Sequence, residues 1–151
     1  MVKGTRADVE KNSLVIPIYA NQENIEKLLE ALTELFERLK QNLEVVFVVD
    51  GSPDRSAAML EEELPSLPFP AQLVQHSRNF GSFAAVVTGL SFCTGDYCAV
   101  MAADLQEPLE LIEEFFLELR NPSIDIVVGA RNGRDDGMVS GAMSQAFWWL
   151  Y

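Results

Sequence analysis

Short apolar runs alternate along this chain with longer segments of helical periodicity, and no other feature restricts the fold as strongly. The runs are rich in β-branched residues and almost uninterrupted, which is typical of strands covered on both faces of a parallel sheet. They occupy residues 13–19, 43–50, 71–76, 97–104 and 123–131. Helices are predicted between and after the runs from apolar residues that recur every three or four positions. These helices span residues 21–40, 56–63, 82–93 and 107–120.

This alternation predicts an α/β fold, with a mostly parallel sheet covered by helices on both faces. In such sheets ligands bind outside the carboxyl ends of the strands. Polar residues follow each predicted strand, at positions 19–21, 50–54, 76–81, 104–106 and 131. We therefore expect side chains that are far apart in the sequence to meet in one crevice.

The chain has the size of one domain. Its 151 residues are 48% hydrophobic, which is enough for one core and too little for two. We expect a flexible tail at residues 1–12 and a single domain at residues 13–151. The last residues, 147–151, read FWWLY and need a surface to pack against. This aromatic end favours the interpretation that the sequence is an N-terminal fragment of a longer protein, and it leads us to expect homo-oligomers.

The net charge of −12 excludes a broad surface for nucleic acid or anionic lipid. A phosphate ligand must instead be held locally, by a metal ion, by backbone N–H groups or by basic residues near loop ends, such as Arg78 and Arg131.

The cysteines and the apolar runs indicate where the protein resides. Cys93 and Cys98 have no further Cys or His ligands nearby, so we interpret them as two buried thiols rather than a metal site. The N-terminus has no apolar signal-peptide core, and no run approaches the roughly 20 apolar residues of a membrane span. A cytoplasmic protein is therefore expected.

Asp104 and Gln106 stand where one apolar run ends, in the stretch MAADLQEP. Their side chains share a face if the backbone stays extended, and both offer oxygen atoms to a hard divalent cation that also binds a diphosphate. The alternative is that Asp104 caps the helix that begins a few residues later.

The stretch VVDGSPDRS covers the end of the second run and the turn after it. Asp50, Gly51 and Ser52 would lie at the mouth of the crevice, close to a nucleoside. The alternative is an ordinary turn, with Asp54 or Ser56 as the cap of the next helix.

The stretch HSRNFGS opens the third predicted helix. Asn79 and Gly81 would help to form an anion site at its N-terminus, unless Asn79 or Ser82 serves only as a cap. His76 is the only histidine, and no nucleophile elbow accompanies it, so we interpret it as structural or peripheral. No Gly-x-Gly-x-x-Gly and no Walker motif follows a strand, which counts against dinucleotide and P-loop proteins.

In this order and spacing, the motifs resemble those of family 2 glycosyltransferases with a GT-A fold, particularly the polyprenyl-phosphate type that includes dolichol-phosphate mannose synthase. The family's P-x-Y-N-E corresponds to PIYAN here, V-D-D-G-S to VVDGS, and D-A-D-L-Q to AADLQ. Its S-R-N-x-G corresponds to residues 77–81, and its G-x-R to residues 129–131.

The resemblance implies a metal-dependent, inverting transfer of a sugar from a nucleotide diphosphate sugar to polyprenyl phosphate or a glycan. Asp104 and Gln106 would hold Mg²⁺ or Mn²⁺ on the diphosphate. Asp104 and Arg131 would be catalytic, with Arg131 neutralising charge during transfer. The implied nucleotide-binding residues are Pro17, Tyr19, Asn21, Asp50, Gly51, Ser52, Asn79 and Gly81. The full-length protein would be membrane-associated through segments outside this sequence.

Three departures from the family pattern fall in this predicted pocket. Asn21 stands where the family commonly has Glu, and Val49 and Ala102 stand where it has Asp. A second hypothesis is therefore a non-catalytic nucleotide-sugar-binding or assembly module with a degenerate metal site. A third is an unrelated doubly wound domain such as a receiver, although YANQEN lacks the acidic cluster that a receiver needs.

Overall fold

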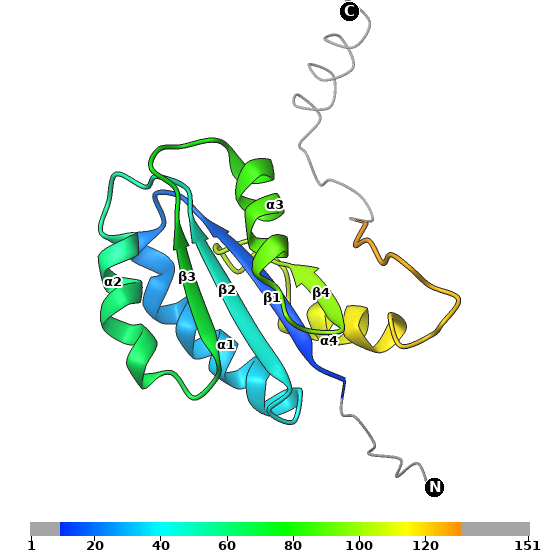
Figure 1. The fold of residues 1–151 in the computed structure, drawn as a ribbon. Helices are drawn as coiled ribbons and strands as arrows, with labels where there is room; N and C mark the ends of the chain where they lie inside the picture. The colour runs from blue at the N-terminus through cyan, green and yellow to red at the C-terminus, as the bar shows by residue number, and fades with distance from the viewer. Residues whose placement is uncertain (1–9, 131–151) are drawn as a thin grey trace, which may run out of the picture.

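Four parallel strands form the sheet of the computed structural model, which describes residues 10–130 (Figure 1). The strands are β1 (Asn12–Ile18), β2 (Leu43–Val49), β3 (Ala71–Gln75) and β4 (Tyr97–Val100). Their order across the sheet is β3-β2-β1-β4, and every pairing is parallel. The predicted α/β class is confirmed.

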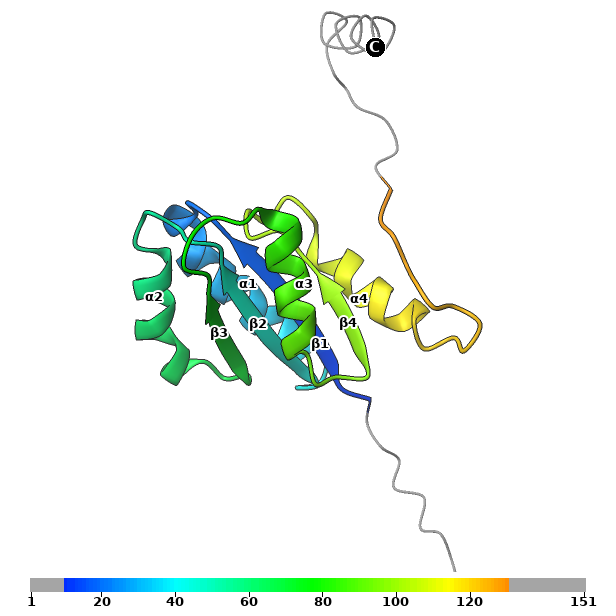
Figure 2. The ribbon, with the colours of Figure 1, turned by 45° about the horizontal axis from the view of Figure 1, so that its top comes forward.

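Four α-helices cover the sheet, three on one face and one on the other (Figures 1 and 2). The first face carries α1 (Ile25–Arg38), α2 (Ser56–Glu63) and α4 (Leu109–Glu118). The second face carries α3 (Ser82–Phe92). Two short 3-10 helices, η1 (Gln22–Asn24) and η2 (Leu64–Ser66), precede α1 and follow α2. None of the helices in residues 10–130 is long and apolar enough to cross a membrane.

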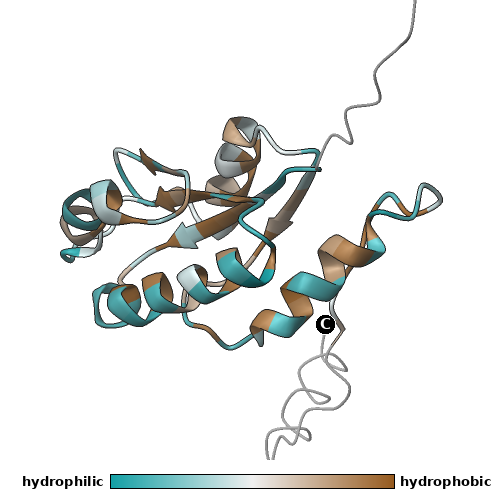
Figure 3. Cartoon of the chain, turned by 90° about the horizontal axis from the view of Figure 1, so that it is seen from below, coloured by the Kyte–Doolittle hydropathy of each residue, from teal (hydrophilic) through white to brown (hydrophobic). Residues whose placement is uncertain are grey.

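The continuous apolar runs in β1 and β2 are explained by burial on both faces. Leu14 and Ile16 pack into the core beneath α1 and α4, whereas Val15 packs on the opposite face with Ala85 of α3. Alternate side chains point to opposite faces of a strand, so both sets must be apolar. By contrast, α1 is polar on its outer side and apolar toward the sheet, as Figure 3 shows.

Helix α3 lies very close to the sheet because Gly89 has no side chain. A Cβ atom at this position would lie 2.3 Å from Cγ1 of Val15 and 3.1 Å from Cγ2 of Val48. Glycine costs roughly 1 kcal/mol of helix propensity relative to alanine, so close packing is the reason it is tolerated here.

A buried carboxylate braces the end of the sheet opposite the carboxyl ends of the strands. Glu44 is 4% exposed and accepts hydrogen bonds from the Ser13 hydroxyl and the Thr94 N–H, both at 2.6 Å, and from the Lys11 ammonium. Burial alone would raise the pKa of Glu44, but these hydrogen bonds outweigh it and hold the pKa at about 2. This cluster ties β1 and β2 to the α3–β4 loop.

The predicted fifth strand at residues 123–131 is wrong for the part that the structure describes. Residues 124–130 form no strand, and the side chains of Ile126 and Val128 are 79% and 80% exposed. Apolar β-branched residues favour a strand only where a neighbouring strand pairs with their N–H and C=O groups. None of the four described strands pairs with this segment.

Two smaller expectations also need correction. The fourth strand stops at Val100 rather than at residue 104, because the chain turns at Ala103 and Asp104. The expectation of two buried thiols is also wrong, because Cys98 is exposed and Cys93 is only partly buried. Cys98 lies on β4, at the edge of the sheet, and is paired in register with Ser13 of β1. Helix α3, which covers this face, packs mainly on β1 and β2.

Candidate functional site

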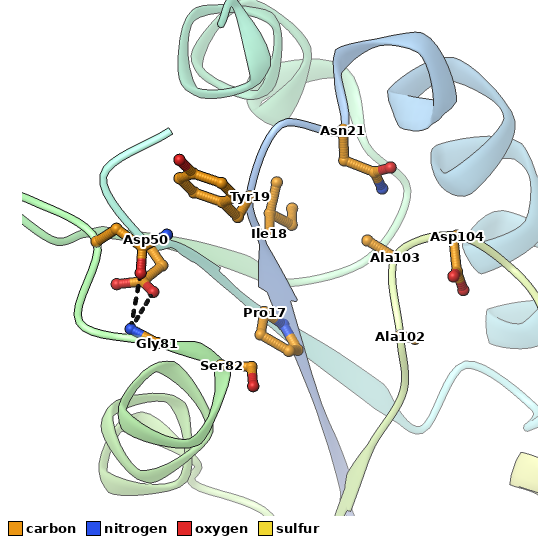
Figure 4. A pocket seen from close by; sticks show the side chains of 11 residues that line it. Pro17, Ile18, Tyr19, Asn21, Asp50, Gly81, Ser82, Ala102, Ala103 and Asp104 are labelled. Atoms are coloured by element: carbon orange, nitrogen blue, oxygen red, sulfur yellow. Dashed lines mark hydrogen bonds between the residues drawn. The ribbon is translucent and has the colours of Figure 1, made fainter. Parts of the chain in front are cut away.

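A pocket of about 370 Å³ opens at the carboxyl ends of β1 and β2, between the N-terminus of α3 and the turn after β4 (Figure 4). Four segments that are far apart in the sequence supply its walls, as the polar residues at the strand ends predict. It is lined by Pro17, Ile18, Tyr19, Asn21, Asp50, Asn79, Gly81, Ser82, Ala102, Ala103 and Asp104.

The segment after β1 is held by the loop after β2. The N–H of Ala20 donates to the Ser52 hydroxyl at 2.8 Å, and the N–H of Gln22 donates to the Asp54 carboxylate at 2.9 Å. Ala20 adopts a φ of +50°, which this bracing sustains. Burial would raise the pKa of Asp54, but its hydrogen bonds from Ser52 and its neighbours hold it at about 2. Tyr19 is thereby presented at the pocket, half exposed.

Asp50 lines the pocket, but the residue is only 2% exposed. Oδ1 accepts from the N–H of Phe80 at 2.9 Å and lies 2.7 Å from Nδ1 of His76, and Oδ2 accepts from the N–H of Gly81 at 2.7 Å. Burial alone would raise the pKa of Asp50, but the hydrogen bonds from Phe80, His76 and Gly81 lower it on balance. Asp50 therefore anchors the loop between β3 and α3.

Gly51 and Ser52 do not line the pocket. Gly51 has a φ of +59°, and a Cβ atom there would lie 2.2 Å from the carbonyl carbon of Arg78. Only glycine allows the two loops to approach so closely. The Ser52 hydroxyl donates to Asp54 at 2.6 Å, so it stabilises its own turn.

The N-terminus of α3 faces the pocket, with Gly81 as the residue that precedes the helix. Gly81 has a φ of +96°, its N–H also donates to Oδ1 of Asn79, and no side chain caps the helix. Neither Asn79 nor Ser82 is thus a capping residue. An uncapped helix N-terminus presents backbone N–H groups and the positive end of the helix dipole, which suits a phosphate.

Asp104 lies across the pocket from α3, in the turn after β4 (Figure 4). Its Oδ1 accepts from the N–H of Gln106 at 3.2 Å, and Leu105 between them has a φ of +56°. The backbone is therefore not extended here, and Gln106 lines a neighbouring cavity of about 360 Å³. Asp104 does not cap α4 either, because Pro108 is the residue that precedes that helix.

The three departures from the family pattern have different surroundings. Val49 is 2% exposed and packs in the main core, and Ala102 lines the pocket. The side-chain oxygen of Asn21 accepts from Asn24 at 2.8 Å, while its nitrogen is buried with no partner among the described residues. In residues 10–130 no group of three or more His, Cys, Asp or Glu side chains lies close enough to hold a metal ion by itself. Arg131 lies outside the described residues.

Sequence reasoning missed the connection of His76 with the pocket. It identified His76 as structural or peripheral, but gave it no partner. Its position directly after β3, beside the carboxyl end of β2, was the available signal.

A family model described as glycosyl transferase family 2 matches residues 13–151. Over 124 residues the chain is 36% identical to an undecaprenyl-phosphate 4-deoxy-4-formamido-L-arabinose transferase of Pseudomonas fluorescens, a match that covers 82% of this chain and 36% of that protein. It is 37% identical over 123 residues to an uncharacterized glycosyltransferase, YkcC, of Bacillus subtilis, covering 81% of this chain and 37% of that one. The chain spans little more than a third of the length of these relatives.

Solved structures of other proteins share the fold, among them the following two. The mannosyltransferase PcManGT of Pyrobaculum calidifontis, in complex with GDP-Man and Mn²⁺, superimposes with a TM-score of 0.72 at 23% identity and covers 83% of this chain and 37% of its own. TarS of S. aureus, in complex with UDP-GlcNAc, gives a TM-score of 0.63 at 20% identity, with coverage of 83% and 37%. The expected GT-A fold is confirmed, and the unrelated doubly wound domain is excluded. The chain belongs to glycosyl transferase family 2.

Proposed function

We propose that this chain is the donor-binding domain, residues 13–151, of a glycosyltransferase that uses a nucleotide diphosphate sugar. The observation that carries the proposal is the pocket itself. It lies at the carboxyl ends of β1 and β2, with the uncapped N-terminus of α3 on one side and the exposed Asp104 on the other. A diphosphate needs such local groups, since the net charge of −12 repels it elsewhere.

In this proposal the nucleoside and the diphosphate of the donor contact different walls of the pocket. Pro17 and Tyr19 contact the nucleoside, and Asn21 and Asn79 offer amide groups to it. The diphosphate lies against the first N–H groups of α3, beside Gly81 and Ser82. The volume of about 370 Å³ is in the range of small-molecule sites.

Mg²⁺ or Mn²⁺ fits this site if the diphosphate supplies several of its ligands. Mg²⁺ is commonly held by one or two carboxylates together with substrate phosphates and water, and the exposed Asp104 provides one carboxylate. Gln106, which lines the neighbouring cavity, would be the second protein ligand in this proposal. The similar fold of PcManGT, solved with GDP-Man and Mn²⁺, supports the same ligand classes. A bound cation would stabilise the charge of the departing nucleoside diphosphate.

The reaction that we propose is a single displacement with inversion. An acceptor oxygen forms a bond to the anomeric carbon while the bond from that carbon to the diphosphate oxygen breaks. Polyprenyl phosphate is the favoured acceptor, because the name of the Pseudomonas relative contains undecaprenyl phosphate. Its phosphate is already ionised and needs no general base, whereas a glycan hydroxyl would need one. Arg131 would offset charge during transfer.

Two secondary features complete the proposal. Cys93 and Cys98 are free thiols, which fits a cytoplasmic location.

Helix α3 exposes Phe83, Val87 and Leu90 at helical spacing and carries no charge, so we propose that it is the surface through which the chain forms homo-oligomers. We also propose that the full-length protein associates with a membrane.

Calorimetric titration with UDP and GDP, each with and without Mn²⁺, tests the donor site. We expect Mn²⁺-dependent binding of one nucleotide and roughly tenfold weaker binding for Asp104→Asn, since a neutral amide is a poorer metal ligand. Asp125→Asn is the matched control, because it removes the same charge from an exposed residue outside the pocket. Equal affinities of the three proteins would contradict the assignment of Asp104.

A non-catalytic binding module is the second candidate function, and the neutral residues Asn21 and Ala102 in the pocket wall favour it. Both candidates predict nucleotide binding. They differ in whether the full-length protein releases nucleoside diphosphate from the donor when polyprenyl phosphate is added. Binding without such release identifies the module.

A further inference from the structure

The carboxylate of Asp50 makes three close contacts with the loop between β3 and α3. Its two oxygens accept hydrogen bonds from the N–H groups of Phe80 and Gly81, and one of them lies close to Nδ1 of His76, all within 2.9 Å. The residue is 2% exposed. A carboxylate in this state offers little to a ligand in the pocket. In Figure 4 it points toward Gly81, at the wall where α3 begins.

His76 connects this carboxylate to α3. Its Nε2 atom lies 2.9 Å from the hydroxyl of Thr88, in the second turn of the helix. The rings of His76 and Phe80 are perpendicular with their centres 5.4 Å apart, and the guanidinium of Arg78 lies 4.8 Å from the centre of the Phe80 ring. The loop from His76 to Gly81 is thus held at both ends and along its length.

We propose that Asp50 and His76 are a positioning pair, which holds the Phe80–Gly81 corner and thereby sets the N-terminus of α3 against the diphosphate. Neither residue touches the donor. The effect of the pair on nucleotide affinity rests on the function proposed above. Its effect on the position of Phe80 and Gly81 does not depend on that function. This assigns Asp50 a different role from the direct contact with the nucleoside that its motif suggests.

The geometry also determines where the proton of neutral His76 resides. The Asp50 carboxylate only accepts hydrogen bonds, so Nδ1 must carry the hydrogen and donate it. Nε2 then accepts from the Thr88 hydroxyl. Neutral His76 is therefore the Nδ1–H tautomer, which ¹⁵N shifts of the ring detect directly.

Three variants test the pair. Asp50→Asn keeps the shape of the side chain but replaces one carboxylate oxygen with an NH₂ group. That group cannot accept the hydrogen bond that the oxygen accepted from Phe80, Gly81 or His76. His76→Ala removes the donor to Asp50. His76→Asn places a side-chain nitrogen close to the position of Nδ1 and should rescue the contact, which a merely space-filling role would not predict.

Amide hydrogen exchange at Phe80 and Gly81 is the first readout. We expect exchange roughly tenfold faster in Asp50→Asn and His76→Ala, near wild-type exchange in His76→Asn, and no change in the control Asp125→Asn. Unchanged exchange in the first two variants, or an Nε2–H tautomer in the wild-type protein at neutral pH, overturns the proposal.

Nucleotide titration is the second readout. If the wild-type protein binds UDP or GDP, the first two variants should bind it roughly tenfold more weakly and His76→Asn should retain most of the affinity. Loss of affinity in Asp50→Asn with unchanged exchange at Gly81 means direct contact with the ligand and overturns the positioning role. No binding by the wild-type protein refutes the proposed function, and the exchange rates then decide on the pair alone.

Discussion

At the scale of single residues, Glu44 carries the clearest dependence on pH. Its pKa is about 2 in the folded protein, against an ordinary value of 4.5. A lowered carboxyl pKa stabilises the fold above the ordinary value, and this stabilisation is lost as the pH falls from about 5 toward about 2. It amounts to roughly 2 kcal/mol, since part of the effect comes from the half-exposed Lys11.

Urea unfolding of Glu44→Gln at several pH values measures this contribution. We expect the variant to be less stable than the wild-type protein at pH 6, by roughly 2 kcal/mol, and the difference to shrink by pH 3. Glu114→Gln, on an exposed part of α4, controls for the loss of a charge. A difference that stays constant with pH would show that Glu44 does not titrate as the hydrogen bonds indicate.

At the scale of elements, the position of α3 depends on Gly89. We expect Gly89→Ala to destabilise the protein by about 1–3 kcal/mol, because the new methyl group overlaps Val15 and this strain exceeds the gain in helix propensity. Thermal or urea unfolding checks the value.

The same contact suggests a compensating change. In a Val15→Ala background the overlap with Val15 disappears and only the 3.1 Å approach to Val48 remains, so Gly89→Ala should cost less than it does alone. Ser91→Ala, at an exposed position of the same helix, should change stability by less than 0.5 kcal/mol or so. Equal costs of Gly89→Ala in both backgrounds would mean that Val15 is not the limiting contact.

At the scale of the whole molecule, two effects on self-association compete. The apolar surface of α3 favours association, whereas the high negative charge of the chain disfavours it. The side chain of Phe83 is 80% exposed, while the net charge of −12 keeps copies apart at low salt. We expect sedimentation equilibrium to show association that increases with salt and is weakened several-fold in Phe83→Ser. Ile126→Ser removes an equally exposed apolar side chain away from α3 and should have no effect. A wild-type protein that stays monomeric at high salt rules out this surface.

Much of the fold could be predicted from local patterns. The apolar run of residues 13–19 corresponds to β1, and the helical spacing after Ile25 to α1, because each pattern reflects burial along one element. Parallel strands also bring their carboxyl ends together, so Tyr19, Asp50 and Asp104 could be assigned to one pocket.

Contacts between distant residues escaped these patterns. The pairing of Asp50 with His76, 26 positions away, depends on how closely two loops approach, and no periodicity records that distance. Gln106 turns into a second cavity because one residue, Leu105, has a positive φ. The predicted strand at residues 123–131 lacks a partner in the described chain. The periodicity of buried residues can be read from neighbouring positions in the sequence. Hydrogen bonds between loops and between strands form only when folding has brought both partners together, so a local pattern does not predict them.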